Sequence, residues 1–402
     1  MKKFRVSLII TCLFISLVGC AGSSTGKTVL NLALREGAYS EVVKSCLAEF
    51  EKENNVLCHV QEYSEAELRE TIYNSRKNEG TVDLCMVDGS WMAQFCEEGV
   101  LTDLSDYGYS MDSDIIAATT DISYYNGDVY LAPYYGNVTV LMYNKRVLQE
   151  NGYEVQDIRS LTDIYDICKS VQENGKNGFL YRGDTNNNLV VDFLPILLSY
   201  GVWVVDEENQ PILDDPFFAP AVSYYKDLIA TGEALPRDDL MQQLVEGKAA
   251  MAIGWPGWYA NIDSEDVGFC ALSGRAFEGA AAYNSNVYGI WTLGVSATSE
   301  HQKESVDLLK YLMDQDVQRE SVAHGGVPCR YSVLLDNNVV REYPEYASIC
   351  DALETGQYRP ITPKWNDFSE IFGAHLRQIL DGDVDVEPGL EAAQAELVDL
   401  MR

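Results

Sequence analysis

The sequence lacks the residue patterns that many enzymes use for catalysis. Its 402 residues include only four histidines, His59, His301, His324 and His375, and no two of them have the HExxH spacing of a zinc site. No cysteines and histidines are spaced like zinc ligands, and the GxSxG motif of serine hydrolases is absent. We therefore expect no catalytic residue, no metal and no cofactor, and we look for a binding function.

Two stretches come close to known motifs without completing them. Residues 246–249, Glu-Gly-Lys-Ala, end like a phosphate-binding loop, but the upstream glycine is missing and alanine replaces the final Ser or Thr. Asp184, Asn186 and Asn188 begin like a calcium loop, but Leu189 stands where the turn needs glycine. Neither a nucleotide site nor a calcium site is predicted.

Positive charge is also scarce. The chain has 29 basic and 62 acidic residues, which gives a formal net charge of −33. A surface with this much negative charge repels nucleic acid and anionic lipid. We therefore expect no nucleic-acid partner and favour a neutral ligand. Paired carboxylates arise by chance in such a chain, so no single pair identifies a glycosidase. A secreted glycoside-acting enzyme nevertheless stays open as an alternative.

Long apolar runs are absent except at the start, where residues 6–18 are almost wholly apolar and follow three basic residues. This run is shorter than the roughly 20 residues that span a bilayer, and it predicts a signal peptide over 1–19. It ends in Leu-Val-Gly-Cys, which resembles a bacterial lipobox and implies lipidation of Cys20. Residues 20–27 are then a flexible, lipidated tether.

Cysteines are present but do not form a dense framework. Of the ten, Cys12 lies in the predicted signal peptide and Cys20 is the predicted lipidation site, and the other eight are scattered without a CxxC motif. An exported chain with an even number could form disulfides. Because several lie in apolar runs, we favour reduced thiols that pack as small hydrophobic side chains.

The rest of the chain alternates between predicted strands and helices, which is typical of α/β lobes with largely parallel sheets. Capping residues place helix starts at Ser40, Ser299 and a capping box of Ser64 with Glu67. About 380 residues after the signal peptide favour two domains. The predicted strands span 29–34, 56–60, 82–87, 179–181, 249–253 and 290–295.

Aromatic residues gather near the ends of these predicted strands, where ligands bind in open α/β sheets. Sugar rings have apolar faces that stack on aromatic planes and hydroxyls that need donors and acceptors. The pattern therefore favours a sugar site, although a non-sugar solute such as a polyamine, phosphate ester or peptide stays open. The six tryptophans are Trp91, Trp203, Trp255, Trp258, Trp291 and Trp365.

Several blocks in a fixed order resemble the extracellular solute-binding proteins of ABC sugar importers, the group that includes the maltose-binding protein. They begin with Asp-Leu-Cys-Met-Val-Asp-Gly-Ser-Trp at 83–91 and end with Arg-Pro-x-x-Pro-x-Trp at 359–365. Together the blocks span nearly the whole chain after the signal peptide. The blocks lie at 83–105, 127–145, 247–255, 291–296, 325–330 and 359–365.

The resemblance implies a two-lobed periplasmic-binding-protein fold of type II, with a ligand cleft between α/β lobes. It implies a first lobe of 28–137 plus 289–331 and a second lobe of 138–288 plus 332–402. It also implies a receptor that delivers a sugar to an ABC permease. We expect this receptor to be a monomer, held at the extracytoplasmic face of the membrane by the lipid on Cys20. The ligand-facing residues that the resemblance implies are Glu36, Asp88, Tyr135, Asp184, Trp255, Trp258, Asn284, Trp291, Arg330 and Trp365.

Overall fold

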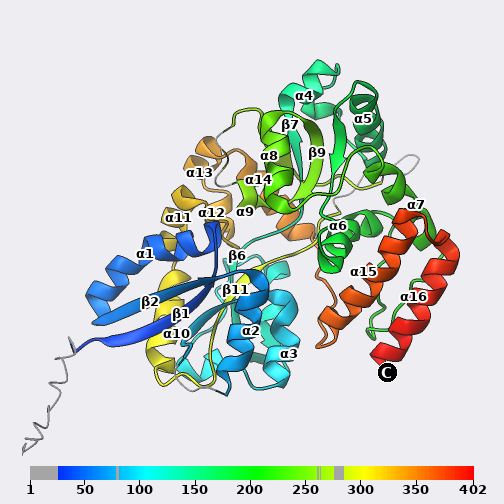
Figure 1. Cartoon of the computed structure of the whole chain (residues 1–402). Helices are drawn as coiled ribbons and strands as arrows, with labels where there is room; N and C mark the ends of the chain where they lie inside the picture. The colour runs from blue at the N-terminus through cyan, green and yellow to red at the C-terminus, as the bar shows by residue number, and fades with distance from the viewer. Residues whose placement is uncertain (1–25, 78–80, 260–261, 263, 276–284) are drawn as a thin grey trace, which may run out of the picture.

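The chain folds into two α/β lobes, each built on its own sheet (Figure 1). The computed structural model describes residues 26–402 except 78–80, 260–261, 263 and 276–284. We call the unit built on the five-stranded sheet the first lobe and the unit built on the four-stranded sheet the second lobe. One cluster of buried residues contains the core of the first lobe together with one face of the second-lobe sheet, and another cluster contains the rest of the second-lobe core.

The first lobe has the strand order β2-β1-β3-β11-β6. Its first strand alternates as the sequence predicts, because Leu30, Leu32 and Leu34 are all buried. The strands are β1 (Thr28–Arg35), β2 (Val56–Tyr63), β3 (Leu84–Asp88), β6 (Leu131–Tyr135) and β11 (Trp291–Val295), with the ribbon β4 (Tyr124–Tyr125) and β5 (Asp128–Val129) beside them. The helices of this half are α1 (Ala38–Asn54), α2 (Glu65–Ser75), α3 (Met92–Glu97), α10 (Gln302–Leu312) and α11 (Gln315–Ser321).

The second lobe has the strand order β10-β7-β9-β8. Helix α15 buries one apolar face through Phe368, Phe372 and Leu376, and it packs against α6 and α16. The strands are β7 (Val140–Asn144), β8 (Asn177–Leu180), β9 (Ala249–Gly254) and β10 (Val267–Cys270). The helices are α4 (Lys145–Glu150), α5 (Leu161–Glu173), α6 (Asn186–Ser199), α7 (Phe218–Ile229), α8 (Arg237–Glu246), α9 (Pro256–Tyr259), α15 (Trp365–Asp381) and α16 (Val386–Met401).

Three chain segments join the lobes and lie side by side, and we call them the hinge. The first is 136–139 between β6 and β7, and the second is 285–290, which returns to β11. The third, 356–364, precedes α15. Backbone hydrogen bonds hold them together, from Gly289 N to Asn137 O at 2.9 Å and from Tyr288 N to Gln357 O at 2.9 Å.

The predicted two-lobed α/β architecture with largely parallel sheets is confirmed, and each sheet contains one strand that runs against the others. Strands β1, β2 and β3 are parallel, whereas β11 is antiparallel to both β3 and β6. In the second lobe only β8 and β9 pair in parallel. The reason is the hinge, because β11 and β7 each enter their sheet from the opposite lobe and therefore run against its other strands.

The helix starts agree with the sequence in one of three cases. The Ser64–Glu67 capping box is confirmed at α2. Helix α1 begins before Ser40, whose hydroxyl donates to the carbonyl of Gly37 at 3.0 Å from inside the first turn. Ser299 does not cap α10 either, since its hydroxyl donates to Asp83 Oδ1 at 2.5 Å.

The predicted lobe boundaries at residues 137 and 331 stay a prediction. Helices α12 (Tyr331–Leu334), α13 (Asn337–Glu342) and α14 (Glu345–Thr355) follow the second boundary, and α14 contacts both η3 (Ala117–Thr119) and β10. The predicted signal peptide and Cys20 lie outside the described residues. The eight later cysteines are free thiols. Within the described ranges, no helix is both long and apolar enough to cross a bilayer.

Candidate ligand-binding site

An aromatic floor lies at the edge of the first lobe that faces the second. The ring of Tyr39, in the first turn of α1, lies 4.8 Å from that of Tyr135 and 5.6 Å from that of Trp291. Behind them, the indoles of Trp291 and Trp91 meet edge to face at 5.5 Å. Burial raises the pKa of Tyr39 to about 12, so its phenol stays neutral and can both donate and accept.

Glu65 is the first residue of α2, directly after the N-cap Ser64. Among the described residues, nothing hydrogen-bonds or ion-pairs with its carboxylate. Burial raises the pKa of this carboxyl group and the nearby Asp88 raises it further, while Arg359, Arg35 and Arg182 oppose the rise. A partly buried carboxylate without a partner carries a desolvation cost that a ligand hydroxyl could offset.

Asp88 ends β3 and anchors Arg359 of the third hinge segment. Arg359 Nη2 lies 2.6 Å from Asp88 Oδ1, and both side chains are buried. The same carboxylate oxygen accepts the backbone N–H of Ser90 at 2.9 Å and its hydroxyl at 2.7 Å. Asp88 therefore fixes the position of a buried guanidinium that keeps further N–H groups available.

The second lobe contributes Arg182, which lies just after β8. Its Nε bonds to Asp192 Oδ1 at 3.1 Å, and its Nη1 donates to Asn188 Oδ1 at 3.0 Å. The guanidinium lies over the ring of the half-buried Trp258, 5.1 Å from its centroid. Asn188 also donates to Asp184 at 2.9 Å.

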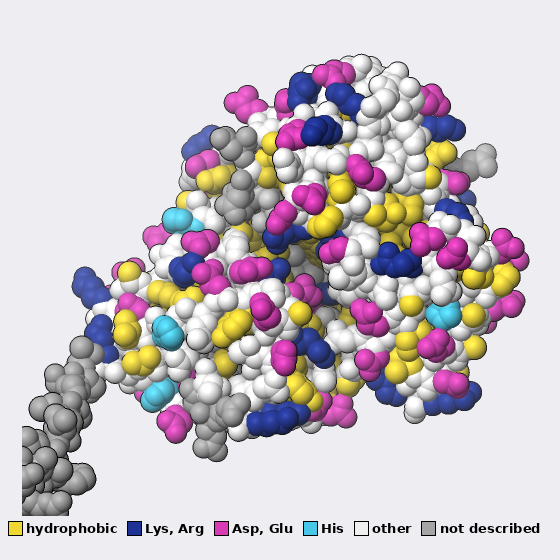
Figure 2. Space-filling view, viewed as in Figure 1, with side chains coloured by type: hydrophobic (Ala, Val, Ile, Leu, Met, Phe, Trp, Pro, Cys, Tyr) yellow, Lys and Arg dark blue, Asp and Glu magenta, His cyan; other side chains and the backbone are white. Residues whose placement is uncertain are grey.

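These groups from the two lobes meet. Gly257 of α9 packs so closely on the first lobe that an added methyl group would lie 3.0 Å from Tyr39 Oη and 3.3 Å from Tyr135 Oη. Helices α2 and α15 also touch, because the Asn366 amide, turned with its oxygen towards Arg69, accepts from Arg69 Nη2 at 2.7 Å. Figure 2 shows the surface hollowed between the lobes, with hydrophobic and basic side chains around the hollow. We call the following residues the interlobe cluster: Tyr39, Glu65, Asp88, Arg182, Trp258 and Arg359.

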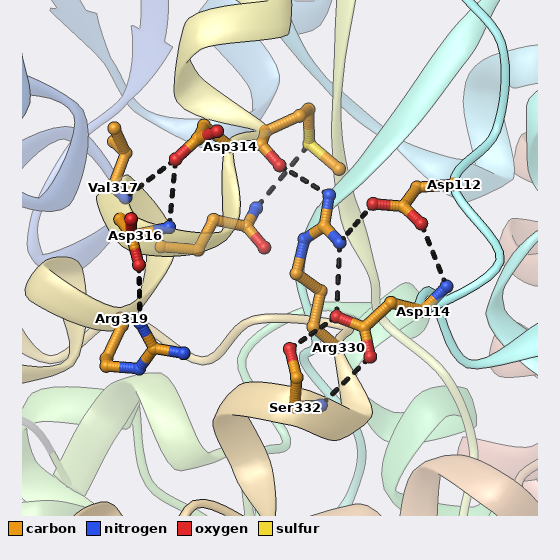
Figure 3. A network of polar contacts seen from close by, with 10 residues as sticks. Asp112, Asp114, Asp314, Asp316, Val317, Arg319, Arg330 and Ser332 are labelled. Carbon is orange, nitrogen blue, oxygen red and sulfur yellow. Dashed lines mark hydrogen bonds and ion pairs between the residues drawn. The ribbon is translucent and has the colours of Figure 1, made fainter.

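Arg330, one of the predicted ligand residues, lies in a different network (Figure 3). Its Nη1 binds Asp112 Oδ2 at 2.6 Å and Asp114 Oδ2 at 3.2 Å, and its Nη2 donates to the carbonyl of Met313 at 2.6 Å. Asp114 also accepts the backbone N–H of Ser332 at 3.0 Å. Both terminal nitrogens are thus engaged in joining chain segments, and we do not place Arg330 in the proposed site.

Other predicted residues support the cluster from behind or lie apart from it. Tyr135 is fully buried and donates its hydroxyl to Gly325 O at 2.7 Å. Trp255 is buried against the hinge, where a Cβ on Gly289 would lie 2.6 Å from its ring. Trp365 is buried in the second lobe and stacks on Phe368 at 5.6 Å. We do not place Trp365 in the site.

The remaining predicted ligand residues lie beside the interlobe cluster or outside the described residues. Glu36 is exposed and pairs with Arg35 at 3.1 Å, beside the cluster. Asp184 is exposed near Arg182, and Asn284 lies outside the described residues. No three His, Cys, Asp or Glu side chains gather as a metal site in the part of the chain that the structure describes. The ligand roles of these residues stay predictions.

Sequence reasoning did not select Tyr39, Glu65, Arg182 or Arg359. A signal existed for two of them, because Arg182 follows a predicted strand and Glu65 follows the strand end and capping residue that the sequence reveals. Arg359 is visible in the sequence only as the first residue of the block at 359–365. Its pairing with Asp88, 271 positions away, has no local signature.

The chain has two lobes, a hinge of three segments and a polar and aromatic cluster between the lobes. This arrangement is typical of proteins that bind a small molecule between two lobes. The chain belongs to the bacterial extracellular solute-binding protein family, whose model matches residues 46–348. The predicted resemblance and the type II fold are therefore confirmed.

Similar proteins agree with this assignment along nearly the whole chain. A probable ABC transporter-binding protein of Deinococcus radiodurans is 23% identical and covers 99% of this chain and 98% of its own. The maltodextrin-binding protein MdxE of Bacillus subtilis is 25% identical over 67% of each chain. The maltose-bound structure of T. maritima MalE3 has a TM-score of 0.82 at 22% identity, and the match covers 93% of this chain and 100% of that one.

Proposed function

We propose that this chain is the substrate-binding protein of a bacterial ABC importer and captures a sugar or oligosaccharide between its lobes. The observation that carries the proposal is the unpaired carboxylate of Glu65 inside a cluster drawn from both lobes. Relatives named for maltodextrin and solved with maltose support a carbohydrate as the ligand class.

Each part of the cluster has a chemical task in this proposal. Glu65 accepts charge-assisted hydrogen bonds from two sugar hydroxyls, while Arg182 and Arg359 donate their remaining N–H groups. The rings of Tyr39 and Trp258 pack against the apolar face of a sugar ring. Because these groups belong to different lobes, a sugar that touches both shifts the population towards the closed form.

A binding role without catalysis is favoured by the state of the carboxylates. Glycosidases use a pair of carboxyl groups, one as acid and the other as nucleophile or base. In the cluster, Asp88 binds Arg359 and Ser90 through Oδ1, whereas the Glu65 carboxylate has no protein partner among the described residues. We therefore propose a receptor in preference to a glycoside-acting enzyme.

The remainder of the proposal concerns delivery. Cleavage of residues 1–19 and lipidation of Cys20 would hold the protein at the outer face of the cytoplasmic membrane, where the closed form would dock as a monomer on a permease. More than one acyl chain is needed for stable anchoring. Cys20→Ser is expected to release the expressed protein from the membrane fraction, and retention of that variant would contradict the anchor.

A thermal-shift panel tests the binding function. A sugar at about 100 times its Kd should stabilise the protein by about 2.7 kcal/mol, so at least one of maltose, maltotriose, diacetylchitobiose and the common monosaccharides should raise Tm. At the same sugar concentration Glu65→Ala and Trp258→Ala should show a clearly smaller shift, while Glu70→Ala, at an exposed position of α2, should keep the full shift. No response to any sugar, or equal responses in all variants, would overturn the proposal. Release of shorter sugars during incubation would establish the enzyme alternative.

A further inference from the structure

A pocket of about 360 Å³ lies against the hinge, apart from the rings of Tyr39 and Trp258. Its floor is the third hinge segment, 356–361, together with Tyr288 of the second segment. One wall comes from η3 (Ala117–Thr119) and η4 (Asp121–Ser123), and the other from residues 203–209 after α6. The first wall belongs to the chain segment between α3 and β4 of the first lobe, and the second wall belongs to the segment between α6 and α7 of the second lobe.

The lining combines aromatic faces with polar groups that are available to a ligand. The rings of Tyr288 and Tyr358 lie 4.5 Å apart, and the indole of Trp203 is half-buried on the opposite wall. Among the described residues, no hydrogen-bond partner engages the indole N–H of Trp203, the side-chain amide of Asn209 or the carboxylate of Asp121. The buried hydroxyl of Tyr358 is also without a partner there.

Arg359 connects this pocket with the interlobe cluster. It lines the pocket, is 8% exposed, and uses Nη2 for its ion pair with Asp88. A guanidinium has five N–H donors, so several remain for a ligand on the pocket side. A buried charge held in place by a carboxylate, with free donors at a cavity, is the kind of group that orients a bound polar molecule.

We propose that this pocket is a second ligand site, for a neutral polyhydroxylated molecule the size of a single sugar ring or a short polyol. Aromatic faces suit C–H groups, while the amide, indole and guanidinium donors and the Asp121 carboxylate suit hydroxyls. Two carboxylates, Asp121 and Asp206, against one guanidinium disfavour an anion. At about 360 Å³ the pocket is within the usual range for small-molecule sites and holds one ring rather than a chain.

Occupancy of the pocket is coupled to lobe closure, a part of the inference that rests on the proposed function. The two walls belong to different lobes, so their separation changes when the lobes move about the hinge. A molecule that fits one wall separation favours that lobe arrangement and changes the affinity of the interlobe cluster for sugar. By linkage, sugar bound in the cluster changes the affinity of the pocket for its own ligand by the same factor.

The experiment first disables the interlobe cluster with Glu65→Gln and Trp258→Ala together. D-glucose, D-galactose and D-mannitol are then titrated by calorimetry up to about 50 mM, an excess over a Kd of about 1 mM. At least one is expected to bind to one site per chain. Adding Trp203→Ala should weaken that binding at least about tenfold, whereas Phe217→Ala, an exposed aromatic of the same lobe outside the pocket, should not.

Asn209→Asp provides a second variant should Trp203→Ala fold poorly, because it keeps the side-chain shape at a backbone φ of 58° and removes the amide donors. In the unmutated protein, the bound probe should change the oligosaccharide Kd by about fivefold or more. No probe binding to the cluster-disabled protein, or equal binding by the pocket variants and Phe217→Ala, would overturn the second site. Undiminished oligosaccharide binding by the cluster-disabled protein would instead remove the interlobe cluster from the sugar site, and absence of oligosaccharide binding by the unmutated protein would overturn the proposed function.

Discussion

Two buried arginine-carboxylate groups in this protein differ in one respect that separates structure from function. Around Arg330, both terminal nitrogens and the facing carboxylates of Asp112 and Asp114 are engaged. In the interlobe cluster, Arg182 and Arg359 are paired but Glu65 is not. A partly buried carboxylate that no protein group engages can accept hydrogen bonds from a ligand, and this is the difference to which we attribute a binding role.

The largest expected effect concerns the stability supplied by the Arg330 network, in which both terminal nitrogens of the guanidinium have partners. Arg330→Met should lower the free energy of unfolding by about 3 kcal/mol, because Asp114 and the Met313 carbonyl lose their partner. Sugar affinity of the folded protein should stay unchanged. Urea unfolding and calorimetric titration measure the two quantities, and the exposed Arg341→Met should be neutral in both. A tenfold loss of affinity without loss of stability would place Arg330 in the site.

The unpaired carboxylate should behave in the opposite way. Glu65→Ala should weaken sugar binding about 30-fold, or about 2 kcal/mol, since a hydrogen bond to a charged group is lost. Its unfolding free energy should not fall, because a desolvated charge is removed. Calorimetry with the best sugar of the panel measures the change, and Glu70→Ala is the matched control. A loss of stability that equals the loss of affinity would make Glu65 a structural residue.

Across the site, Trp258 tests whether the second lobe contributes binding energy. Trp258→Ala should weaken sugar binding about tenfold through the loss of ring packing. The change in Tm should be small, since the indole is half-buried. The control Phe217→Ala removes an exposed aromatic side chain elsewhere in the second lobe, and this variant should bind sugar normally. Normal binding by Trp258→Ala would confine the site to the first lobe.

The pH dependence of stability should separate the two groups by sign. The Asp114 backbone N–H and Arg330 lower the pKa of Asp112, so its contribution is present above the ordinary value of 3.8 and is lost as pH falls further. Burial raises the pKa of Glu65, so the native state binds its proton more tightly and loses stability as pH rises above 4.5 through the raised value.

Unfolding measured from pH 3 to pH 8 in the wild type, Arg330→Met and Glu65→Gln should show this difference, although it is the smallest of these effects. Arg330→Met should remove part of the loss in acid, and Glu65→Gln should remove part of the decline above pH 4.5. Identical profiles for Glu65→Gln and the wild type would contradict the raised pKa.

The sequence predicted the lobes and several site positions because these depend on local patterns. Alternation located β1, and the strand-end rule placed Asp88 and Trp258 where the lobes meet. The same rule could not distinguish Trp258 from Trp365, because the burial of Trp365 depends on the helices that pack around α15. The role of Arg330 was equally unreadable, since Asp112 and Asp114 lie more than 200 positions away.

The central claim is that a sugar supplies the partner that the Glu65 carboxylate lacks. Such a sugar stabilises the ionised form, so its binding should release protons when the pH is near or below the raised pKa of Glu65. Calorimetric titration at one pH in buffers of different ionisation enthalpy measures this release directly. We expect proton release by the wild type and none by Glu65→Gln, and equal proton release by both proteins would show that the sugar does not bind the Glu65 carboxylate.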